Sequence, residues 1–276
     1  MMLCPDLVCP ECKHDLPESL FCNTCQHQYQ MDQNIPLLLK NPDRFAEMIE
    51  EMERLTKKYG DSPLIYNHDA SPLINVAVDW NEKLRQKVFI EEFATITNCR
   101  VLEVGCATGT YLAPLVKHNE TFGIDLVPGM LRLANQKGIF VLQASATQLP
   151  FKDDYFDAAL CLSLTPYFHQ PKPLLDELKR VLKPTGKLFF NSPIQGGIRK
   201  LAAPLTRLIH RNKNVAVEKK YTLAELDDML KSHGFDVLQV KTFVFPFLLK
   251  QSTKKPSRFQ QALATEVLYT LAPRTS

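Results

Sequence analysis

The stretch from Arg100 to Asp125 constrains the fold more than any other part of this sequence. It predicts a short buried strand at 101–104, a turn rich in small residues, a helix at 110–116 and a second strand at 121–124. Small residues in the turn let the backbone pass close to a ligand, and the free amides at a helix start favour a polar or anionic group. Together these features describe a nucleoside-binding half-fold of the α/β class.

Two acidic residues narrow the choice of nucleoside. Asp125 ends the second predicted strand, twenty residues after Gly105, where a carboxylate accepts hydrogen bonds from both hydroxyls of a ribose. Glu103 lies two residues before Gly105, where its charge would repel the pyrophosphate of a dinucleotide. A cofactor that carries a sulfonium and an ammonium would instead be attracted. The alternative is an α/β domain that has a glycine turn and binds no cofactor.

The run from Glu103 to Gly109, EVGCATG, resembles the first motif of the class I S-adenosylmethionine-dependent methyltransferases. Further segments resemble later motifs of this family in the same order, at 125–131, 144–151, 156–157 and 182–187. The resemblance covers about residues 98–243. It implies a Rossmann-like sheet with helices on both faces, and S-adenosylmethionine (SAM) as the cofactor.

The resemblance also implies which residues contact SAM. They are Glu103, Gly105, Cys106, Ala107, Gly109, Asp125, Leu126, Ser145, Ala146, Leu162 and Ser163. Ser145 departs from the family motif, which has an aspartate that holds the adenine amino group, so the charge-assisted hydrogen bond is missing there. Tyr167 and His169 are the candidates for a general base, although each also suits a purely structural role and the transfer needs no base in every case.

The first forty residues contain two C-x-x-C pairs, Cys9 with Cys12 and Cys22 with Cys25. Two such pairs at short spacing place four thiolates around one tetrahedral ion, which predicts a structural zinc site. Two disulfides are the alternative, and Cys4 is not needed as a ligand. Because the sequence shows no secretion signal and its cysteines are clustered, we expect reduced thiols and a cytoplasmic location.

We expect three regions along the chain. They are a zinc ribbon at 1–40, a helical linker or cap at 41–97, and a methyltransferase domain at 98–276 with a basic helical insertion at 196–220. Within them we expect helices at 44–58, 80–96, 171–183 and 259–271, and further strands at 139–143, 158–163, 187–191 and 236–243. The segment 222–234 resembles the family's penultimate helix. Thr222 is the predicted N-cap of its helix.

The insertion at 196–220 combines an apolar helical face with an excess of positive charge. The bases are Arg199, Lys200, Arg207, Arg211, Lys213, Lys219 and Lys220, against the single acid Glu218. Such a helix has three possible roles. It can lie on an anionic membrane surface, it can hold an acidic substrate, or it can pack its apolar face on its own domain as a lid and leave its basic face in solvent. Of these, we expect a mobile lid over the acceptor pocket that contacts the substrate and not the cofactor, with its bases facing an acidic head group or an anionic membrane.

The acceptor of the methyl group is the least defined part of the sequence. The net charge of +3 is too small to indicate a nucleic acid, and no apolar run reaches the length of a membrane span. Acids outnumber bases in residues 1–40, which argues against a ribbon that reads RNA. We therefore expect a small or lipid-like acceptor at O, N or C. The alternatives are a ribosomal RNA guanine methyltransferase and a catalytically silent, cofactor-binding scaffold.

Overall fold

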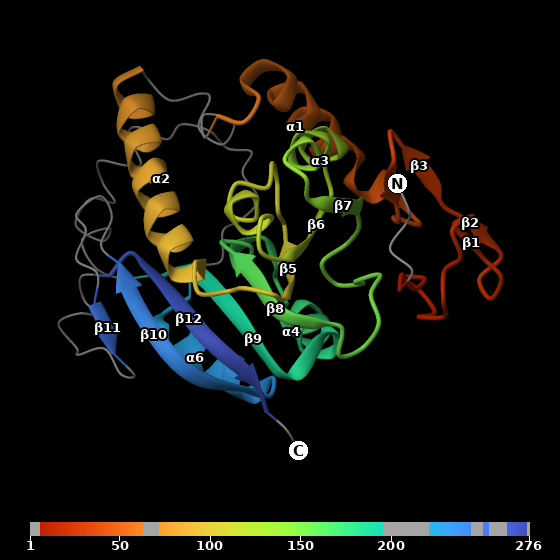
Figure 1. The fold of residues 1–276 in the computed structure, drawn as a ribbon. Helices are drawn as coiled ribbons and strands as arrows, with labels where there is room; N and C mark the ends of the chain where they lie inside the picture. The colour runs from red at the N-terminus through yellow and green to blue at the C-terminus, as the bar shows by residue number, and fades with distance from the viewer. Residues whose placement is uncertain (1–5, 63–71, 196–220, 244–250, 254–263, 275–276) are drawn as a thin grey trace.

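The computed structural model describes residues 6–62, 72–195, 221–243, 251–253 and 264–274. In these ranges one large mixed sheet has the strand order β11-β10-β12-β9-β8-β5-β6-β7-β4-β3, and a small hairpin pairs β1 with β2. Helices cover both faces of the large sheet (Figure 1). The predicted α/β class is therefore confirmed. Cys4 and the insertion at 196–220 lie outside the described residues.

Five parallel strands form the centre of the sheet. Val104 pairs with Ile124 on one side and with Cys161 on the other, so the carboxyl ends of three neighbouring strands meet at one edge. The central strands are mostly buried, as parallel strands covered on both faces must be. The strands are β5 (Arg100–Val104), β6 (Glu120–Asp125), β7 (Phe140–Gln143), β8 (Phe156–Leu162) and β9 (Leu182–Pro193).

Antiparallel strands extend the sheet beyond β9. These are β10 (Phe235–Phe243), β11 (Gln251–Thr253) and β12 (Glu266–Pro273). The predicted helix at 259–271 is wrong in its described part, because β12 occupies most of it. β12 pairs with β9 on one side and β10 on the other, and both of its faces are largely buried. A segment that is apolar on both faces lacks the alternation that distinguishes a strand from a helix.

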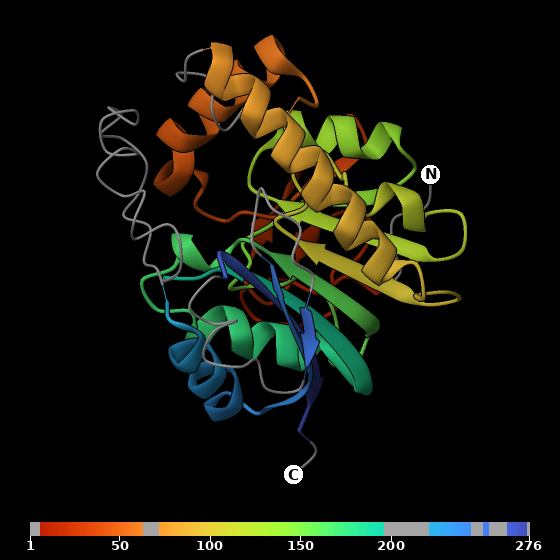
Figure 2. The same ribbon diagram turned by 90° about the vertical axis from the view of Figure 1, so that its left-hand side faces the viewer.

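The helix α2 (Pro72–Phe93) covers one face of the sheet, and α4 (Lys172–Val181) and α6 (Leu223–Ser232) cover the other (Figure 2). Phe93 packs edge-on against Phe189 of β9, with ring centroids 5.2 Å apart. The predicted N-cap is confirmed, since Thr222 and Glu225 form a reciprocal capping box. Two more helices lie over the β6–β7 end, α1 (Ala46–Tyr59) and α3 (Pro128–Gln136).

The predicted helix at 110–116 is wrong. The chain forms turns there and a single 3₁₀ turn, η3 (Ala113–Leu115). Ala113 N donates to Gly109 O at 2.9 Å, but Pro114 has no N–H with which to continue an α-helical ladder. The first strand of the nucleoside-binding half-fold is therefore followed by a compact turn instead of a helix.

The N-terminal region joins the large sheet instead of standing apart from it. β3 (Gln30–Asp32) and β4 (Ile35–Leu37) form its far edge, and β4 runs parallel to β7 with Leu37 opposite Gln143. Cys9 and Cys22 belong to the same buried cluster as residues of α4 and α6. The region boundaries at residues 40 and 97 remain predictions. The described residues before position 40 do not have a hydrophobic core of their own, because they share one with α4 and α6.

Candidate cofactor site and cysteine cluster

The segments that follow four parallel strands lie together at one edge of the sheet. The amides of Gly105 and Cys106 both donate to Ile124 O at 2.9 Å. Ala144 N donates to Asp125 O at 3.2 Å, and Ser163 N donates to Asn191 O at 3.1 Å. The residues predicted to contact SAM, at 103–109, 125–126, 145–146 and 162–163, all lie on these strand ends or the turns after them. The fold thus brings the predicted set to one place, as ligand sites in open α/β sheets require.

Asp125 ties the glycine turn to the start of α3. Its Oδ2 accepts a hydrogen bond from Ala107 N at 2.9 Å, and its Oδ1 accepts one from Val127 N at 3.0 Å. Ala107 has a φ of 47°, in the left-handed region that costs a residue with a side chain about 1–2 kcal/mol. The bond from Asp125 helps to hold it there. Burial raises the pKa of Asp125, and the hydrogen bonds from Val127 and Ala107 oppose that shift.

Glu103 is a buried acid with unused hydrogen-bonding capacity. Its side chain alternates along β5 with Leu102 and Val104, which pack under α4 and α6, so it lies on the face covered by α2. The residue is 2% exposed, and its Oε2 has no hydrogen-bond partner among the described residues. Burial raises the pKa of Glu103 well above its usual value, as does the charge of Asp125, while Arg85 opposes the shift. A cationic ligand is the natural partner for such a carboxylate.

Sequence reasoning missed a polar network that α2 brings to the same edge. Arg85 donates from Nη1 to Ser163 Oγ at 2.8 Å and from Nη2 to Glu82 Oε1 at 2.9 Å. Ser163 Oγ in turn donates to Asn191 Oδ1 at 2.8 Å, so the end of β8 is held from two sides. The spacing of Glu82, Arg85 and Phe89 could have indicated this network. Residues three and seven positions apart share one face of a helix, so the two charged residues lie on the same face as the apolar Phe89.

Among the residues that the structure describes, acidic side chains outnumber basic ones in this part of the site. Arg85 also lies 3.7 Å from Glu266 of β12, and Tyr111 donates to Glu82 Oε1 at 3.3 Å. In the described contacts, Arg85 is the positive charge that faces Glu82 and Glu266. It also interacts electrostatically with Glu103. This electrostatic balance fits a ligand that carries positive charge and not one that carries phosphates.

Other predicted residues have contacts of a different kind. Ser145 Oγ lies 2.9 Å from Thr147 Oγ1 and accepts from Thr147 N at 3.3 Å, which closes a local turn after β7. Tyr167 ends the 3₁₀ turn η4 (Thr165–Tyr167) and is 57% exposed, and His169 is also exposed. The roles of these residues remain predictions.

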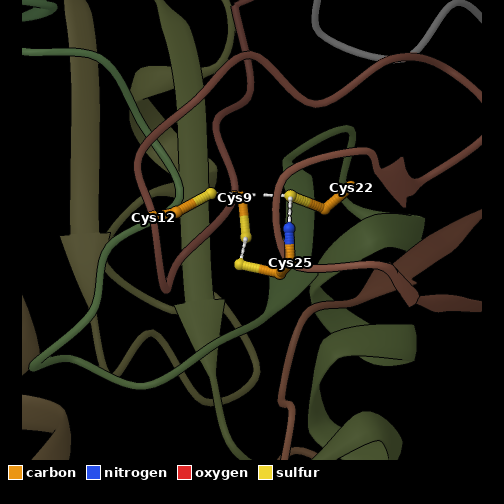
Figure 3. A group of neighbouring side chains, drawn as sticks. All are labelled: Cys9, Cys12, Cys22 and Cys25. Atoms are coloured by element: carbon orange, nitrogen blue, oxygen red, sulfur yellow. Dashed lines mark hydrogen bonds between the residues drawn. The ribbon is translucent and has the colours of Figure 1, made fainter.

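The four cysteines of the two C-x-x-C pairs converge on one point (Figure 3). The sulfur of Cys9 lies 3.9 Å from that of Cys25, and the sulfur of Cys12 lies 3.5 Å from that of Cys22. Tetrahedral zinc with Zn–S bonds of about 2.3 Å needs sulfurs about 3.8 Å apart, so the donor set fits this ion. A backbone hydrogen bond from His14 lowers the pKa of Cys12 to about 6, whereas burial raises the pKa of Cys22 and the hydrogen bond with Cys12 raises that of Cys25. The hairpin of β1 (Phe21–Cys22) and β2 (His27–Gln28) carries the second pair.

Comparison with known proteins defines the family. A family model described as "Methyltransferase domain" matches residues 102–190. The uncharacterized protein MJ1123 of Methanocaldococcus jannaschii is 31% identical over 150 residues, which is 53% of this chain and 69% of that protein. The demethylmenaquinone methyltransferase of Clavibacter sepedonicus is 34% identical over 114 residues, 39% of this chain and 46% of that enzyme. The chain belongs to the class I SAM-dependent methyltransferase family.

A solved structure has the same fold. A SAM-dependent methyltransferase from Thermotoga maritima superposes with a TM-score of 0.59 at 19% sequence identity, and the match covers 82% of this chain and 99% of that one. Among the described residues, no helix is long and apolar enough to cross a membrane.

The raised pKa of Glu103 predicts how stability depends on pH. Between the ordinary glutamate value of 4.5 and its higher folded value, the native protein binds more protons than the unfolded chain. The free energy of unfolding therefore falls as the pH rises through this window. Glu103→Gln should lose this part of the pH dependence, and at pH values above this window it should be more stable than wild type.

Urea unfolding across pH 5–8 measures both effects. Glu120→Gln, an exposed change on β6, is the control, and an unchanged slope in Glu103→Gln contradicts the assignment.

The cysteine geometry predicts one zinc ion per chain. Cys9→Ser should lose the metal, because a structural site needs all four of its ligands. Cys4→Ser should keep it. Metal analysis of the purified proteins by mass spectrometry is the measurement. Retention of zinc by Cys9→Ser together with its loss from Cys4→Ser would show that the ligand set is wrong.

Proposed function

We propose that this protein transfers a methyl group from SAM to a small or lipid-like acceptor at an O, N or C atom. The observation that carries the proposal is the buried Glu103, whose Oε2 has no hydrogen-bond partner among the described residues, beside the turn that Asp125 holds. Bound SAM supplies an electrophilic methyl group on a sulfonium. The protein's part is to orient the two reactants and to exclude water from them.

The residues at the strand ends divide this task. Asp125 would accept the ribose hydroxyls with the lone pairs that its amide donors leave free. Glu103 would balance the positive charge of the cofactor, and Ser145 and Ala146 would border adenine. Gly105, Cys106, Ala107, Gly109 and Leu126 would line the cofactor with their backbone, and Leu162 and Ser163 would border its reactive end. Tyr167 and His169, both exposed, stay the candidates for a base where the acceptor needs one.

The name of the Clavibacter relative supports a small, lipid-like acceptor, because it denotes a methyltransferase of demethylmenaquinone. The acidic character of residues 1–40 supports the same choice over RNA, since phosphate contacts dominate RNA affinity. The basic segment 196–220 would add a peripheral contact with an anionic membrane. The cluster of reduced cysteines supports a cytoplasmic location.

The ribose role of Asp125 predicts a loss of cofactor affinity in Asp125→Asn. The loss should be about 1.5–3 kcal/mol, the range for hydrogen bonds to a charged group. Isothermal calorimetry with SAM measures it. Asp157→Asn is the matched control, because Asp157 lies at the start of β8 and accepts from Arg100 N at 2.9 Å, away from the carboxyl ends. Equal affinity of Asp125→Asn and wild type would remove Asp125 from the site.

The proposed activity predicts that methyl-labelled SAM transfers its label to a cell extract in a form that partitions into organic solvent or stays with small molecules. The experiment fractionates the extract after incubation and counts each fraction. Label in RNA would favour the ribosomal RNA alternative. Cofactor binding without label in any fraction would favour a silent scaffold. Heat-treated protein is the control for non-enzymatic methylation.

A further inference from the structure

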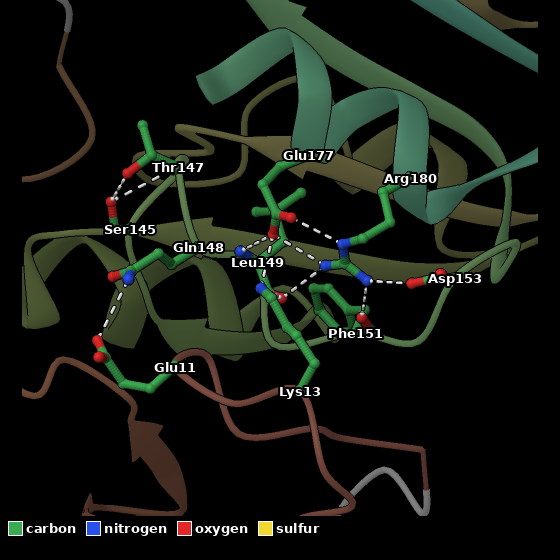
Figure 4. A network of polar contacts seen from close by, with 10 residues as sticks. All are labelled: Glu11, Lys13, Ser145, Thr147, Gln148, Leu149, Phe151, Asp153, Glu177 and Arg180. Carbon is green, nitrogen blue, oxygen red and sulfur yellow. Dashed lines mark hydrogen bonds and ion pairs between the residues drawn. The ribbon is translucent and has the colours of Figure 1, made fainter. Parts of the chain in front are cut away.

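The segment 145–151, which follows β7 and carries Ser145 and Ala146, is held by residues from two distant parts of the chain (Figure 4). Lys13 donates from Nζ to Leu149 O at 3.1 Å and forms an ion pair with Glu177 Oε2 at 2.8 Å. Leu149 N donates to the same Glu177 oxygen at 2.6 Å. Both peptide groups of Leu149 are therefore bonded to charged side chains, one from the cysteine region and one from α4.

Arg180 of α4 completes this arrangement. It donates from Nη2 to Leu149 O at 3.0 Å and from Nη1 to Phe151 O at 2.7 Å. Its Nε donates to Glu177 Oε1 at 2.7 Å, which keeps the carboxylate aligned with Leu149 N. The side chains of Leu149 and Phe151 are fully buried. Lys13, Glu177 and Arg180 form what we call the clasp, and hydrogen bonds between charged groups and peptide groups give it more strength than an exposed ion pair has.

The cysteine region reaches the segment through its backbone as well. Val8 N donates to Pro150 O at 3.1 Å, Leu7 forms an antiparallel bridge with Phe151, and Gln148 Nε2 donates to Glu11 Oε1 at 3.2 Å. Lys13 follows Cys12 directly, and Lys13 N donates to Cys9 O at 2.9 Å. The turn of the first C-x-x-C pair thus determines where the Lys13 side chain begins.

We propose that Lys13 is a positioning residue of the cofactor site, and that the clasp holds the segment 145–151 where Ser145 and Ala146 meet the adenine end of SAM. The inference rests on the proposed function. A segment that is already ordered loses little entropy when a ligand binds, so a loose segment lowers affinity without any lost contact to the ligand. The cysteine cluster then contributes to cofactor affinity from outside the site, because it fixes the turn that carries Lys13.

Lys152 provides a matched comparison across the same interface. Its Nζ lies 3.4 Å from Asp6 and 3.2 Å from Asp15, and its side chain is 41% exposed. Both partners are carboxylates of the N-terminal region. An exposed pair of this kind contributes little, so its loss should leave the segment in place.

The test compares Lys13→Met, Lys13→Arg and Lys152→Met by calorimetry with S-adenosylhomocysteine and by hydrogen exchange of the Leu149 amide. Lys13→Met should weaken binding about tenfold and speed exchange at Leu149, because one partner of the clasp is lost. Lys13→Arg should recover part of the affinity, and Lys152→Met should stay within about twofold of wild type. Urea unfolding of each variant separates these local effects from a loss of global stability.

Removal of the metal from wild type with a mercurial reagent and chelator should weaken binding about as much as Lys13→Met does. Metal-free Lys13→Met should bind no more weakly than either single change, because two changes that act through one contact are not additive. Wild-type affinity in Lys13→Met, or fully additive losses, overturns the inference while the proposed function stands. If wild-type protein does not bind S-adenosylhomocysteine, the proposed function fails and the inference fails with it.

Discussion

Carboxylates placed at the carboxyl ends of β5 and β6 impose the constraint on which the rest of the site depends. Glu103 is buried, and one of its oxygens has no hydrogen-bond partner within the described ranges. Asp125 uses both of its oxygens to hold the left-handed Ala107 and the start of α3. Burying such groups destabilises a fold unless a partner compensates them. The chain keeps them where the parallel strands open, the position at which an open α/β sheet receives a ligand. Under the proposed function, the cationic cofactor would provide the missing charge.

The face covered by α2 is organised around this charge. Arg85 joins Ser163 at the end of β8 to Glu82 of its own helix and lies near Glu266 of β12. Asn191 of β9 accepts from Ser163 and donates to Val267 O at 2.9 Å, so three strands and a helix are connected through polar side chains. Buried networks of this kind fix one arrangement of their members when each is satisfied. This side of the site is therefore built from elements far apart in the sequence.

The opposite side of the site depends on the N-terminal region. β4 adds a strand beside β7, and the first cysteine pair places Lys13 against Leu149. So small a region buries too little apolar surface to fold on its own, and a metal ion contributes folding energy in such cases. Here the region also shares a core with α4 and α6. The cysteine cluster and the shared core both contribute contacts to the segment 145–151, which follows β7.

The sequence by itself determined the features that are local. A glycine turn after a buried strand, an acid at the end of the next strand, a capping box at Thr222 and two C-x-x-C pairs each lie within a few residues, where spacing reports conformation directly. The Rossmann-like sheet with helices on both faces followed from the resemblance to a known family. The four cysteines of the candidate metal site were identifiable because their geometry follows from two short repeats.

The tertiary structure decided what depends on contacts between distant segments. β12 is a strand because β9 and β10 satisfy its backbone on both sides, which its doubly apolar sequence does not reveal. The turn at 110–116 is a different case, because Pro114 interrupts the helical ladder there and is visible in the sequence itself. Arg85 and Lys13 acquire their partners only when α2 and the cysteine region dock on the sheet. The sequence does not show which partner a charged side chain will have, because most charged residues lie on the solvent-exposed surface.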